Sequence, residues 1–561
     1  MNPVNVARSV HAIGMTLAGA TAGDAAQMGF KAANLARLAG AGLPVPPAFV
    51  LGTGWCAQDR SDPEGFRAAL RDVLGDGLRA LEGASGLVFG GERKPLLVSV
   101  RSGAAVSMPG MMDTILNIGL CERSVRGMLR LTGNPRMVWD CYRRLVQQYA
   151  TIVRGAPGAP FDALVADAVG RARVEGPREL DFESLAQLAR ESLELFAQLT
   201  GDDFPQDPRE QAEDATIAVL SSWESARAVE YRRLQGLPQD SGTAVTVQRM
   251  VFGNAGGTSG SGVGFTRDPA TGEHRLYLDF LFNAQGEDVV SGRQAVTDTA
   301  SLPRALPEVA SRVEEMGGAL EALFGDAQEF EFTVQDGRLF LLQARTAKRT
   351  PWAALRIAVE QVAAGIVSTA DALQRLDGMD LARIERRRLD TDGAQALAVA
   401  EPASIGMASG AIALDPKACA RLAAKGRSVL LVREDASTDD IAGIALAAGL
   451  LTARGGRTSH AAVVARQMGK ACLVGCATLR IDLATRSIRL GTRTFKEGEV
   501  ICLDAEDGRV FAGEPGTVVE RPVAWLAEVA KWRAAELPAK VATALPLLPR
   551  LPAPGVATPV R

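Results

Sequence analysis

Residues 455–469 read GGRTSHAAVVARQMG, and this stretch places one of the chain's three histidines, His460, at the start of a predicted helix. Thr458 and Ser459 are favourable N-cap residues, and Gly469 is the residue type that most often ends a helix. The first turn of a helix has unpaired N–H groups and a positive dipole, which stabilise a nearby anion by about 0.3–1 kcal/mol. The position therefore suits a phosphorylated histidine, and a capping or surface histidine is the alternative from local sequence alone.

The histidine stretch belongs to a compact pattern that runs from about residue 399 to residue 515. SVLLVRE (428–434) predicts a strand, IAGIALAAGLLTARGG (441–456) passes from helix to strand, and EVICLDAEDGRVFAG (499–513) predicts a closing hairpin. This alternation predicts a small β/α domain that carries the histidine.

Residues 1–350 alternate strand-like and helix-like segments. PLLVSVRSG (95–103) and GTAVTVQRMVFGN (242–254) are β-rich runs, and SLAQLARESLELFAQLTG (184–201) has helical spacing that ends in glycine. We expect an α/β or α+β domain here, so the chain as a whole is predicted to be an α/β and α+β multidomain protein.

Two segments flank the histidine domain. Residues 351–398 are predicted to be a charged helical connector, in which the arginines of LARIERRRLD (381–390) form a solvated helix face. Residues 516–561 end in LPLLPRLPAPGVATPVR, whose prolines predict an extended or disordered tail.

Composition narrows the class of protein. The 62 basic and 65 acidic residues give a net charge of −3, which indicates neither a nucleic-acid nor a membrane-surface partner. No apolar stretch approaches the ~18 residues that span a bilayer. The seven cysteines are odd in number and widely spread, so we expect buried free thiols in a cytoplasmic protein.

Two basic residues of the N-terminal domain are placed to meet phosphate. Lys31 follows a glycine and precedes a predicted helix in MGFKAANLARLAGAGLPVPPAFVL (28–51), and Arg101 ends the strand of VSVRSG. Arginine binds phosphate through a planar fork, and lysine does so as a point charge. An ordinary helix-start lysine and an ordinary strand arginine are the alternatives.

The glycine-rich segment VFGNAGGTSGSGVGFTRDPATGE (251–273) offers backbone N–H groups to a phosphate chain, or forms a flexible hairpin. Further on, Glu329 and Glu331 share one strand face, as do Gln343 and Arg345. Their oxygens are suited to Mg²⁺, with Arg345 on a phosphate. Cross-strand salt bridges are the alternative.

Taken in order, these segments resemble the pyruvate, phosphate dikinase family over roughly residues 25–515. The matching segments are long and specific: LPVPPAF, LLVSVRSGAAVSMPGMMDTILN, DFPQDPREQ, GTAVTVQRMVFGN, SGVGFTRDPATGE, FNAQGEDVVSG, LLQARTAKRT and GGRTSHAAVVARQMGKACLVG. The resemblance implies an ATP-grasp nucleotide-binding domain in residues 1–350, followed by a swivelling phosphohistidine domain in residues 399–515.

By that resemblance, His460 is the phosphorylated catalytic residue. Glu331 and Gln343 are the implied Mg²⁺ ligands, and ATP is the substrate. Thr458 and Arg454, near the histidine, are candidates for regulation or for supporting phosphate. The implied ATP-binding positions are Lys31, Arg101, Glu287, Glu329, Glu331, Gln343 and Arg345.

The chain also departs from the family's pattern. The family usually has Arg, Glu, Asp, Met and Pro at the positions held here by Ala105, Asp279, Glu329, Arg457 and Ile405. Exchange of one carboxylate for another can preserve a site. Loss of the cation at Ala105 predicts weaker phosphate binding.

The family continues after the histidine domain into a β/α barrel of about 250 residues that binds pyruvate or phosphoenolpyruvate. Only about 46 residues follow here, so we expect the ATP- and phosphate-dependent half-reaction alone: phosphorylation of His460 with release of AMP and pyrophosphate. Transfer to pyruvate would need a separate barrel protein.

Two alternatives remain open. One is transfer to a different acceptor, because phosphoenolpyruvate synthase and rifampicin phosphotransferase have similar domains. The other is a nucleotide-responsive regulatory protein, which Ala105 favours and His460, Glu331 and Arg345 oppose.

Overall fold

The computed structural model describes residues 9–57, 62–106, 113–239, 241–290, 301–389, 395–436, 440–457 and 460–544. The chain divides into two compact units, each with its own core. Unit 1 comprises residues 1–267, 275–347 and 454–460, and unit 2 comprises residues 268–274, 348–453 and 461–561.

The first sheet of unit 1 is antiparallel, in the order β1-β2-β7-β5-β6. Helix α2 (Phe30–Gly40) ends before the prolines of LPVPP, which cannot continue a helix, and the chain then enters β2. The strands are β1 (Val10–Ile13), β2 (Ala48–Leu51), β5 (Val98–Gly103), β6 (Thr114–Ile118) and β7 (Ala244–Arg249).

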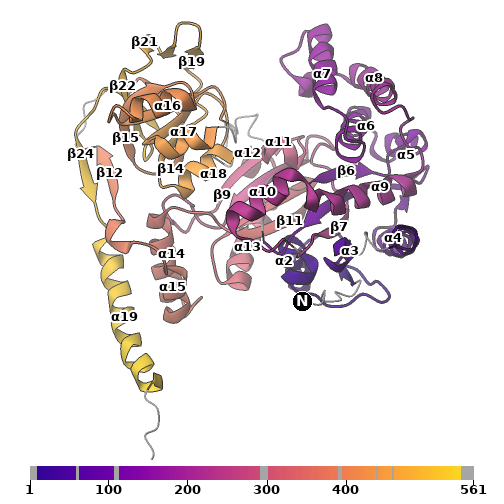
Figure 1. The fold of residues 1–561 in the computed structure, drawn as a ribbon, viewed down its shortest axis with the longest axis horizontal. Helices are drawn as coiled ribbons and strands as arrows, with labels where there is room; N and C mark the ends of the chain where they lie inside the picture. The colour runs from indigo at the N-terminus through magenta and orange to yellow at the C-terminus, as the bar shows by residue number, and fades with distance from the viewer. Residues whose placement is uncertain are drawn as a thin grey trace, which may run out of the picture. The chain divides into compact units, whose positions relative to one another are not determined.

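A helical layer packs on this sheet (Figure 1), with α9 against β5, β6 and β7, and α6 against β6. Edge-to-face aromatic contacts join Tyr142, Tyr149 and Phe196 to Phe204 in its core. The helices are α4 (Pro63–Ser85), α5 (Glu122–Thr132), α6 (Pro135–Gln148), α7 (Ala159–Ala172), α8 (Phe182–Thr200), α9 (Pro208–Ser221) and α10 (Ala226–Gln235). Shorter elements are α1 (Ala25–Met28), α3 (Gly54–Ala57), β3 (Val88–Phe89) and β4 (Pro95–Leu96).

The second sheet of unit 1 is also antiparallel, in the order β11-β10-β8-β9. Helices α2 and α13 pack on it and share a core with the phenylalanines of β9 and β10. Its elements are β8 (Gly260–Phe265), β9 (Tyr277–Phe282), α11 (Gly286–Val290), α12 (Ser301–Ala305), α13 (Pro307–Phe324), β10 (Gln328–Gln335) and β11 (Arg338–Thr346).

Part of the glycine-rich segment, Gly260–Phe265, forms strand β8. On β8, Gly262 and Gly264 lie opposite Phe332 and Phe330. A Cβ atom on either glycine would lie 2.5 Å or 2.3 Å from the facing phenylalanine ring. The glycines therefore make room for aromatic rings in the core.

Unit 2 contains a mixed sheet in the order β13-β23-β22-β15-β16-β17-β18-β14, with β15 to β18 parallel. The predicted strand, the helix-to-strand passage and the closing hairpin appear as β16, as α17 with β17, and as β22 with β23. The elements are β13 (Ala398–Val399), β14 (Glu401–Ser404), β15 (Met407–Ala413), α16 (Pro416–Ala423), β16 (Val429–Arg433), α17 (Ile441–Leu446), β17 (Gly449–Thr452), α18 (His460–Gln467), β18 (Ala471–Val474), β19 (Leu479–Asp482), β20 (Ser487–Leu490), β21 (Arg493–Lys496), β22 (Val500–Asp504) and β23 (Arg509–Ala512).

The connector and the tail differ from expectation. The connector begins with helices α14 (Pro351–Ala363) and α15 (Thr369–Arg375), but part of its arginine run forms a strand, β12 (Arg386–Leu389). This strand pairs with β24 (Thr517–Glu520) in the predicted tail, which continues as helix α19 (Val523–Ala544).

Two features explain the difference. Arg386 forms ion pairs with Glu506 at 3.3 Å and Glu520 at 3.0 Å and covers the ring of Trp352, so it is a cross-linking residue and not a solvated one. Residues 523–544 are rich in alanine, and Val529 and Trp532 are buried against α14 and α15. The proline-rich residues 545–561 lie outside the described residues.

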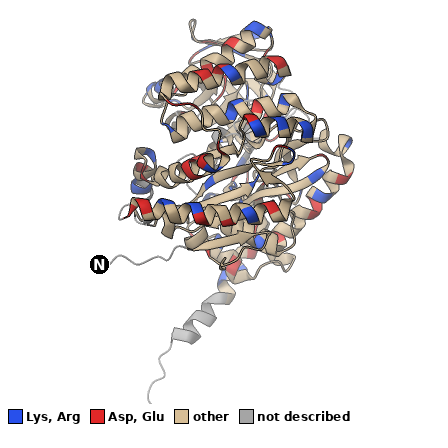
Figure 2. Ribbon diagram, turned by 90° about the vertical axis from the view of Figure 1, so that its right-hand side faces the viewer, with Lys and Arg blue, Asp and Glu red and all other residues tan. Residues whose placement is uncertain are grey.

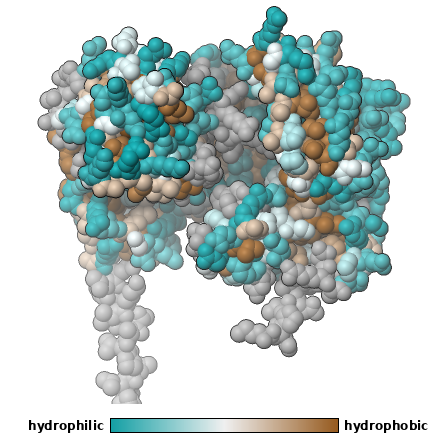
Figure 3. Space-filling model, turned by 45° about the horizontal axis from the view of Figure 1, so that its top comes forward, coloured by the Kyte–Doolittle hydropathy of each residue, from teal (hydrophilic) through white to brown (hydrophobic). Residues whose placement is uncertain are grey.

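Charged residues of both signs are interspersed along the helices (Figure 2), and hydrophilic residues cover much of the face that Figure 3 shows. Within the described part of the chain, no helix has the length and apolar character needed to cross a membrane. All seven cysteines lie in the described ranges as free thiols, and all but Cys56 are buried.

Candidate functional site

A cavity of about 430 Å³ lies in unit 1, with walls from both sheets, α2 and the segment that enters α11. It brings together Lys31, Arg101, Glu331 and Gln343 from the predicted set, residues that are up to 312 positions apart (343 − 31) in the chain. Its lining also includes Ser99, Thr114, Leu116, Gln248, Arg249, Met250, Val251, Gly253, Ser261, Gln285, Gly286, Thr333 and Leu342.

Lys31 is placed by the start of α2, which is fastened to both sheets. Gly29 has a φ of +79°, and a Cβ atom there would lie 2.2 Å from the carbonyl oxygen of Gly103 at the end of β5. The next residue, Phe30, donates its N–H to the Ala104 carbonyl at 2.9 Å. Only glycine permits this approach, so it sets the distance between the helix start and the strand.

The contact of α2 with the second sheet is made by a buried side-chain amide. Asn34 on α2 is 7% exposed and donates Nδ2 to the carbonyl of Ala344 on β11 at 2.9 Å. A helix anchored at the end of β5 through Phe30 and to β11 through Asn34 keeps Lys31 on the same cavity as Arg101 and Gln343. The two sheets therefore supply one site.

The second sheet presents its polar residues in rows across the strands. Asp279, Val263, Glu331 and Gln343 are successive register partners on β9, β8, β10 and β11. Register partners share one face of a sheet, so Asp279 lies in the same row as the two predicted Mg²⁺ ligands. Tyr277, Phe265, Glu329 and Arg345 form the next row.

A β-bulge on β11 determines which side chains of this strand face the core and which line the cavity. The register shifts after the Glu331–Gln343 pair, so that Phe332 pairs with Leu341 and Leu342 is the extra residue. Leu339, Leu341 and Ala344 then face the core, while Leu342 and Gln343 line the cavity. Strict alternation would have placed Leu341 and Gln343 on the same face.

Cross-strand contacts join the predicted residues in pairs. Gln343 Nε2 donates to Glu331 Oε1 at 3.3 Å. Arg345 forms an ion pair with the buried carboxylate of Glu329. Phosphate or metal binding and cross-strand pairing were alternatives in the sequence. Both pairings are present, and the Glu331–Gln343 pair lines the cavity whereas the Glu329–Arg345 pair does not.

The ionisation of the site follows from its crowding. Desolvation by the surrounding cavity lining lowers the pKa of Lys31 even though the residue is exposed to solvent; Glu331 opposes this shift, and Arg101 and Arg345 add to it. Burial disfavours the charge of Arg345, but Glu329 and Glu331 outweigh it and raise its pKa. The cations thus repel one another, and an anionic ligand would relieve that repulsion.

The few protein oxygens available in the cavity suit a metal ion that is bound mainly by the phosphates of a nucleotide. No group of three or more His, Cys, Asp or Glu side chains suited to a metal occurs among the described residues. The Glu331 carboxylate accepts a hydrogen bond from the amide nitrogen of Gln343, so the amide must turn over to offer its oxygen to a cation beside that carboxylate. Mg²⁺ in phosphate sites takes one or two protein oxygens and completes its shell with phosphate and water.

Sequence reasoning missed several lining residues, of which Arg249 matters most. It ends β7, two residues before the glycine-rich segment, and its Nε is buried without a hydrogen-bond partner among the described residues. Burial lowers the pKa of Arg249, and Arg338 adds to that effect. The signal was an arginine at the end of a buried strand, the same signal that singled out Arg101.

The remaining predicted residues are placed only in part. His460 opens helix α18 and Glu287 lies in α11, but the side chains of both lie outside the described atoms. Thr458 is likewise outside the described residues, and Arg454 follows β17.

Comparison with known proteins gives these observations a context. Residues 78–305 match the family described as the AMP/ATP-binding domain of pyruvate phosphate dikinase. Residues 426–508 match the mobile domain of phosphoenolpyruvate-utilising enzymes. The pyruvate, phosphate dikinase of Rhizobium meliloti (strain 1021) is 40% identical over 526 residues, which cover 91% of this chain and 58% of the relative.

The chain belongs to the pyruvate, phosphate dikinase family.

Other members show the same extent of similarity. Pyruvate, phosphate dikinase of Clostridium symbiosum is 39% identical over 87% of this chain and 56% of its own length. Pyruvate, phosphate dikinase 2 of Oryza sativa subsp. japonica is 40% identical over 87% of this chain and 55% of its own length. The chain thus spans just over half the length of these members of the pyruvate, phosphate dikinase family.

The two matched regions contain most of the cavity lining and the helix that begins at His460. Most of the cavity-lining residues lie within residues 78–305, and α18 with His460 lies within residues 426–508.

Proposed function

We propose that the chain is a phosphotransferase that binds Mg²⁺-ATP in the cavity of unit 1 and transfers a phosphoryl group to His460. The observation that carries the proposal is the convergence of Lys31, Arg101 and the Glu331–Gln343 pair on one cavity. Family membership supports it, because the matched regions are a nucleotide-binding domain and a mobile domain.

The proposed reaction has two steps. The neutral imidazole of His460, whose ordinary pKa lies near 6.5, attacks the β-phosphorus of ATP, and AMP leaves as the bond to the α-phosphate oxygen breaks. Inorganic phosphate then attacks the γ-phosphorus, pyrophosphate leaves, and one phosphoryl group remains on the histidine. ATP and phosphate are the ligands in this scheme.

The residues of the cavity have distinct roles in this proposal. Lys31 and Arg101 neutralise charge on the phosphate chain, and Arg345 exchanges part of its bond with Glu329 for a phosphate oxygen. Glu331 and Gln343 would hold Mg²⁺, which supplies charge stabilisation and orientation for the phosphates. For the transfer to occur, His460 at the start of α18 must reach this cavity.

The acceptor after His460 is the finer part of the proposal. We propose that the phosphoryl group passes to pyruvate in the presence of a separate barrel-bearing protein, with a different acceptor as the alternative. The half-reaction on the histidine does not depend on that choice.

Isotope placement tests the proposal. Incubation with phosphate and either β-³²P-ATP or γ-³²P-ATP should leave the β label on the protein and release the γ label as pyrophosphate. Alkaline mass spectrometry should locate the label at His460, and a His460→Asn variant should carry none. Protein-bound γ label after complete reaction, or β label on the variant, would contradict the mechanism.

A further inference from the structure

The segment from Phe282 to Asp288, here called the wall segment, forms one side of the cavity. It links β9 to α11, and its Gln285 and Gly286 line the cavity. Asn283 adopts a φ of +49°, a left-handed conformation that asparagine tolerates better than most residues. A segment with this conformation needs support from its surroundings to keep one position.

Arg178 supports the start of the wall segment from the helical layer. It donates to the carbonyl oxygens of Phe282 at 2.8 Å and Asn283 at 3.1 Å. Arg178 is held in turn by Arg136 of α6, which donates to the Arg178 carbonyl and, at 3.0 Å, to that of Leu180. A chain of contacts therefore runs from α6 to the end of β9.

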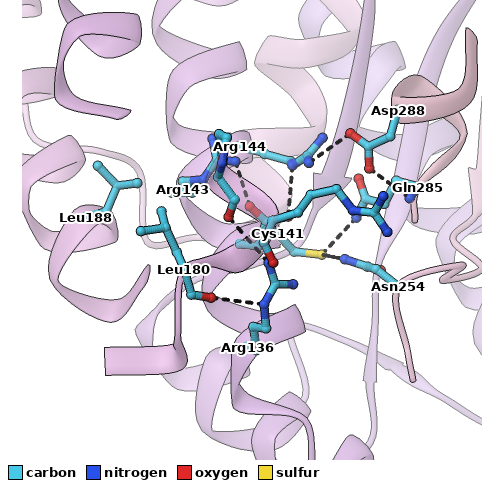
Figure 4. Close-up of polar contacts among 12 residues, drawn as sticks. Arg136, Cys141, Arg143, Arg144, Leu180, Leu188, Asn254, Gln285 and Asp288 are labelled. Carbon is cyan, nitrogen blue, oxygen red and sulfur yellow. Dashed lines mark hydrogen bonds and ion pairs between the residues drawn. The ribbon is translucent and has the colours of Figure 1, made fainter. Parts of the chain in front are cut away.

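Arg144 supports the other end of the wall segment (Figure 4). Its guanidinium bridges Asp140 of α6 at 3.0 Å and Asp288 of α11 at 3.1 Å. Asp288 in turn accepts the backbone N–H of Gln285 at 3.0 Å. The bridge thus reaches a residue that lines the cavity through one intermediate side chain.

A buried thiol lies between these two supports. Gln285 is 5% exposed and donates Nε2 to Cys141 Sγ at 3.1 Å, and Asn254 donates to the same sulfur at 3.8 Å. Figure 4 shows the side chains of Asn254 and Gln285 both directed at the sulfur of Cys141, a residue of α6. Gln285 is therefore fixed through both its backbone and its side chain.

We propose that Arg144 and Arg178 are positioning residues that hold the wall segment in the geometry that binds the nucleotide. The contacts through which Arg144 and Arg178 hold the wall segment are here called the brace. The inference takes its ligand from the proposed function, but the brace itself follows from the contacts alone. Neither arginine lines the cavity, so both act through the wall segment. Arginine suits this role because its planar fork can bond two partners in fixed directions.

Arg143 provides a matched comparison. It is the neighbour of Arg144, is 8% exposed and pairs with the same Asp140 at 2.6 Å. Among the described residues it makes no bond to the wall segment. Arg143→Met and Arg144→Met therefore each remove one ion pair to Asp140, and only the second cuts the bridge to Asp288.

Hydrogen–deuterium exchange without nucleotide tests the brace. Arg144→Met and the milder Asp288→Asn should each speed amide exchange in residues 282–290 by about ten-fold or more, while Arg143→Met should not. The double variant should exchange little faster than the faster single variant, because both substitutions weaken the same Arg144–Asp288 ion pair. Unchanged exchange in Arg144→Met, or an equal increase in Arg143→Met, would overturn the brace.

Nucleotide affinity tests whether the brace contributes to nucleotide binding. The probe is Mg²⁺ with α,β-methylene-ATP, whose α–β bridge cannot be cleaved, so that binding is measured without turnover. Arg144→Met should bind about ten-fold more weakly, with the rate of histidine phosphorylation at saturating ATP within about two-fold of the parent. Faster exchange with unchanged affinity would overturn the positioning role. A parent chain that binds no nucleotide would instead overturn the proposed function, because the exchange result does not depend on it.

Discussion

At the scale of single residues, substitutions in the Glu329–Arg345 pair can distinguish a phosphate-binding role of Arg345 from a purely structural salt bridge. Arg345→Met leaves the carboxylate of Glu329 buried without its cation, so we expect ATP affinity to fall by roughly ten- to a hundred-fold and stability to fall as well. Glu329→Gln frees the guanidinium for a phosphate, so affinity should hold or rise. Calorimetric titration with Mg²⁺-ATP measures both. Equal losses in the two variants would make the pair a structural salt bridge.

Cys141 gives a second prediction at this scale. Burial, with a smaller effect of Asp140, raises the pKa of its thiol to about 12. A raised thiol pKa keeps the neutral form at pH 8, and only the thiolate reacts with alkylating agents. Iodoacetamide should therefore modify the half-buried Cys56 of the native protein well before Cys141, as peptide mass spectrometry would show. Rapid labelling of Cys141 at pH 8 would mean that α6 opens from the wall segment.

At the scale of elements, the close approach of α2 to β5 controls where Lys31 lies. Gly29→Ala places a Cβ atom against Gly103 and strains a positive φ, so we expect a loss of about 2–4 kcal/mol in stability together with weaker ATP binding. Gly40→Ala, at the open end of the same helix, is the control and should be neutral or slightly stabilising. Thermal denaturation and nucleotide titration of both variants provide the check.

The strands also show which parts of the fold could be predicted from the sequence. Buried runs such as residues 428–434 and 499–513 were predicted correctly, because period and composition are local properties. The strand at Arg386 was not, since its partner on β24 is more than 100 residues away and no local pattern indicates it. In the site, residue types suggested Lys31, Arg101 and Glu331. Arg249 and the wall segment depended on which strand ends meet.

At the scale of the whole molecule, the proposed half-reaction predicts a characteristic time course. With Mg²⁺-ATP and phosphate, the 561-residue polypeptide should release AMP in a burst of about one per chain, followed by slow hydrolysis, because phosphohistidine accumulates without an acceptor. Rapid-quench chromatography measures the burst. A His460→Asn variant should show none, and steady pyruvate-dependent turnover by the polypeptide alone would contradict the half-reaction.

The bulge at Leu342 has a consequence for insertions and deletions. Loss of one residue between Leu339 and Leu342 can be absorbed by closing the bulge, because another leucine then takes the vacated core position and Gln343 keeps its partner Glu331. On β10 the corresponding stretch has no spare residue, and a one-residue deletion there would turn Phe332 toward the polar side. A deletion scan scored by soluble yield should therefore tolerate shortening on β11 and reject it on β10. In the β10–β11 hairpin, which carries part of the site, only β11 can therefore lose a residue during evolution without exchanging its core and cavity faces.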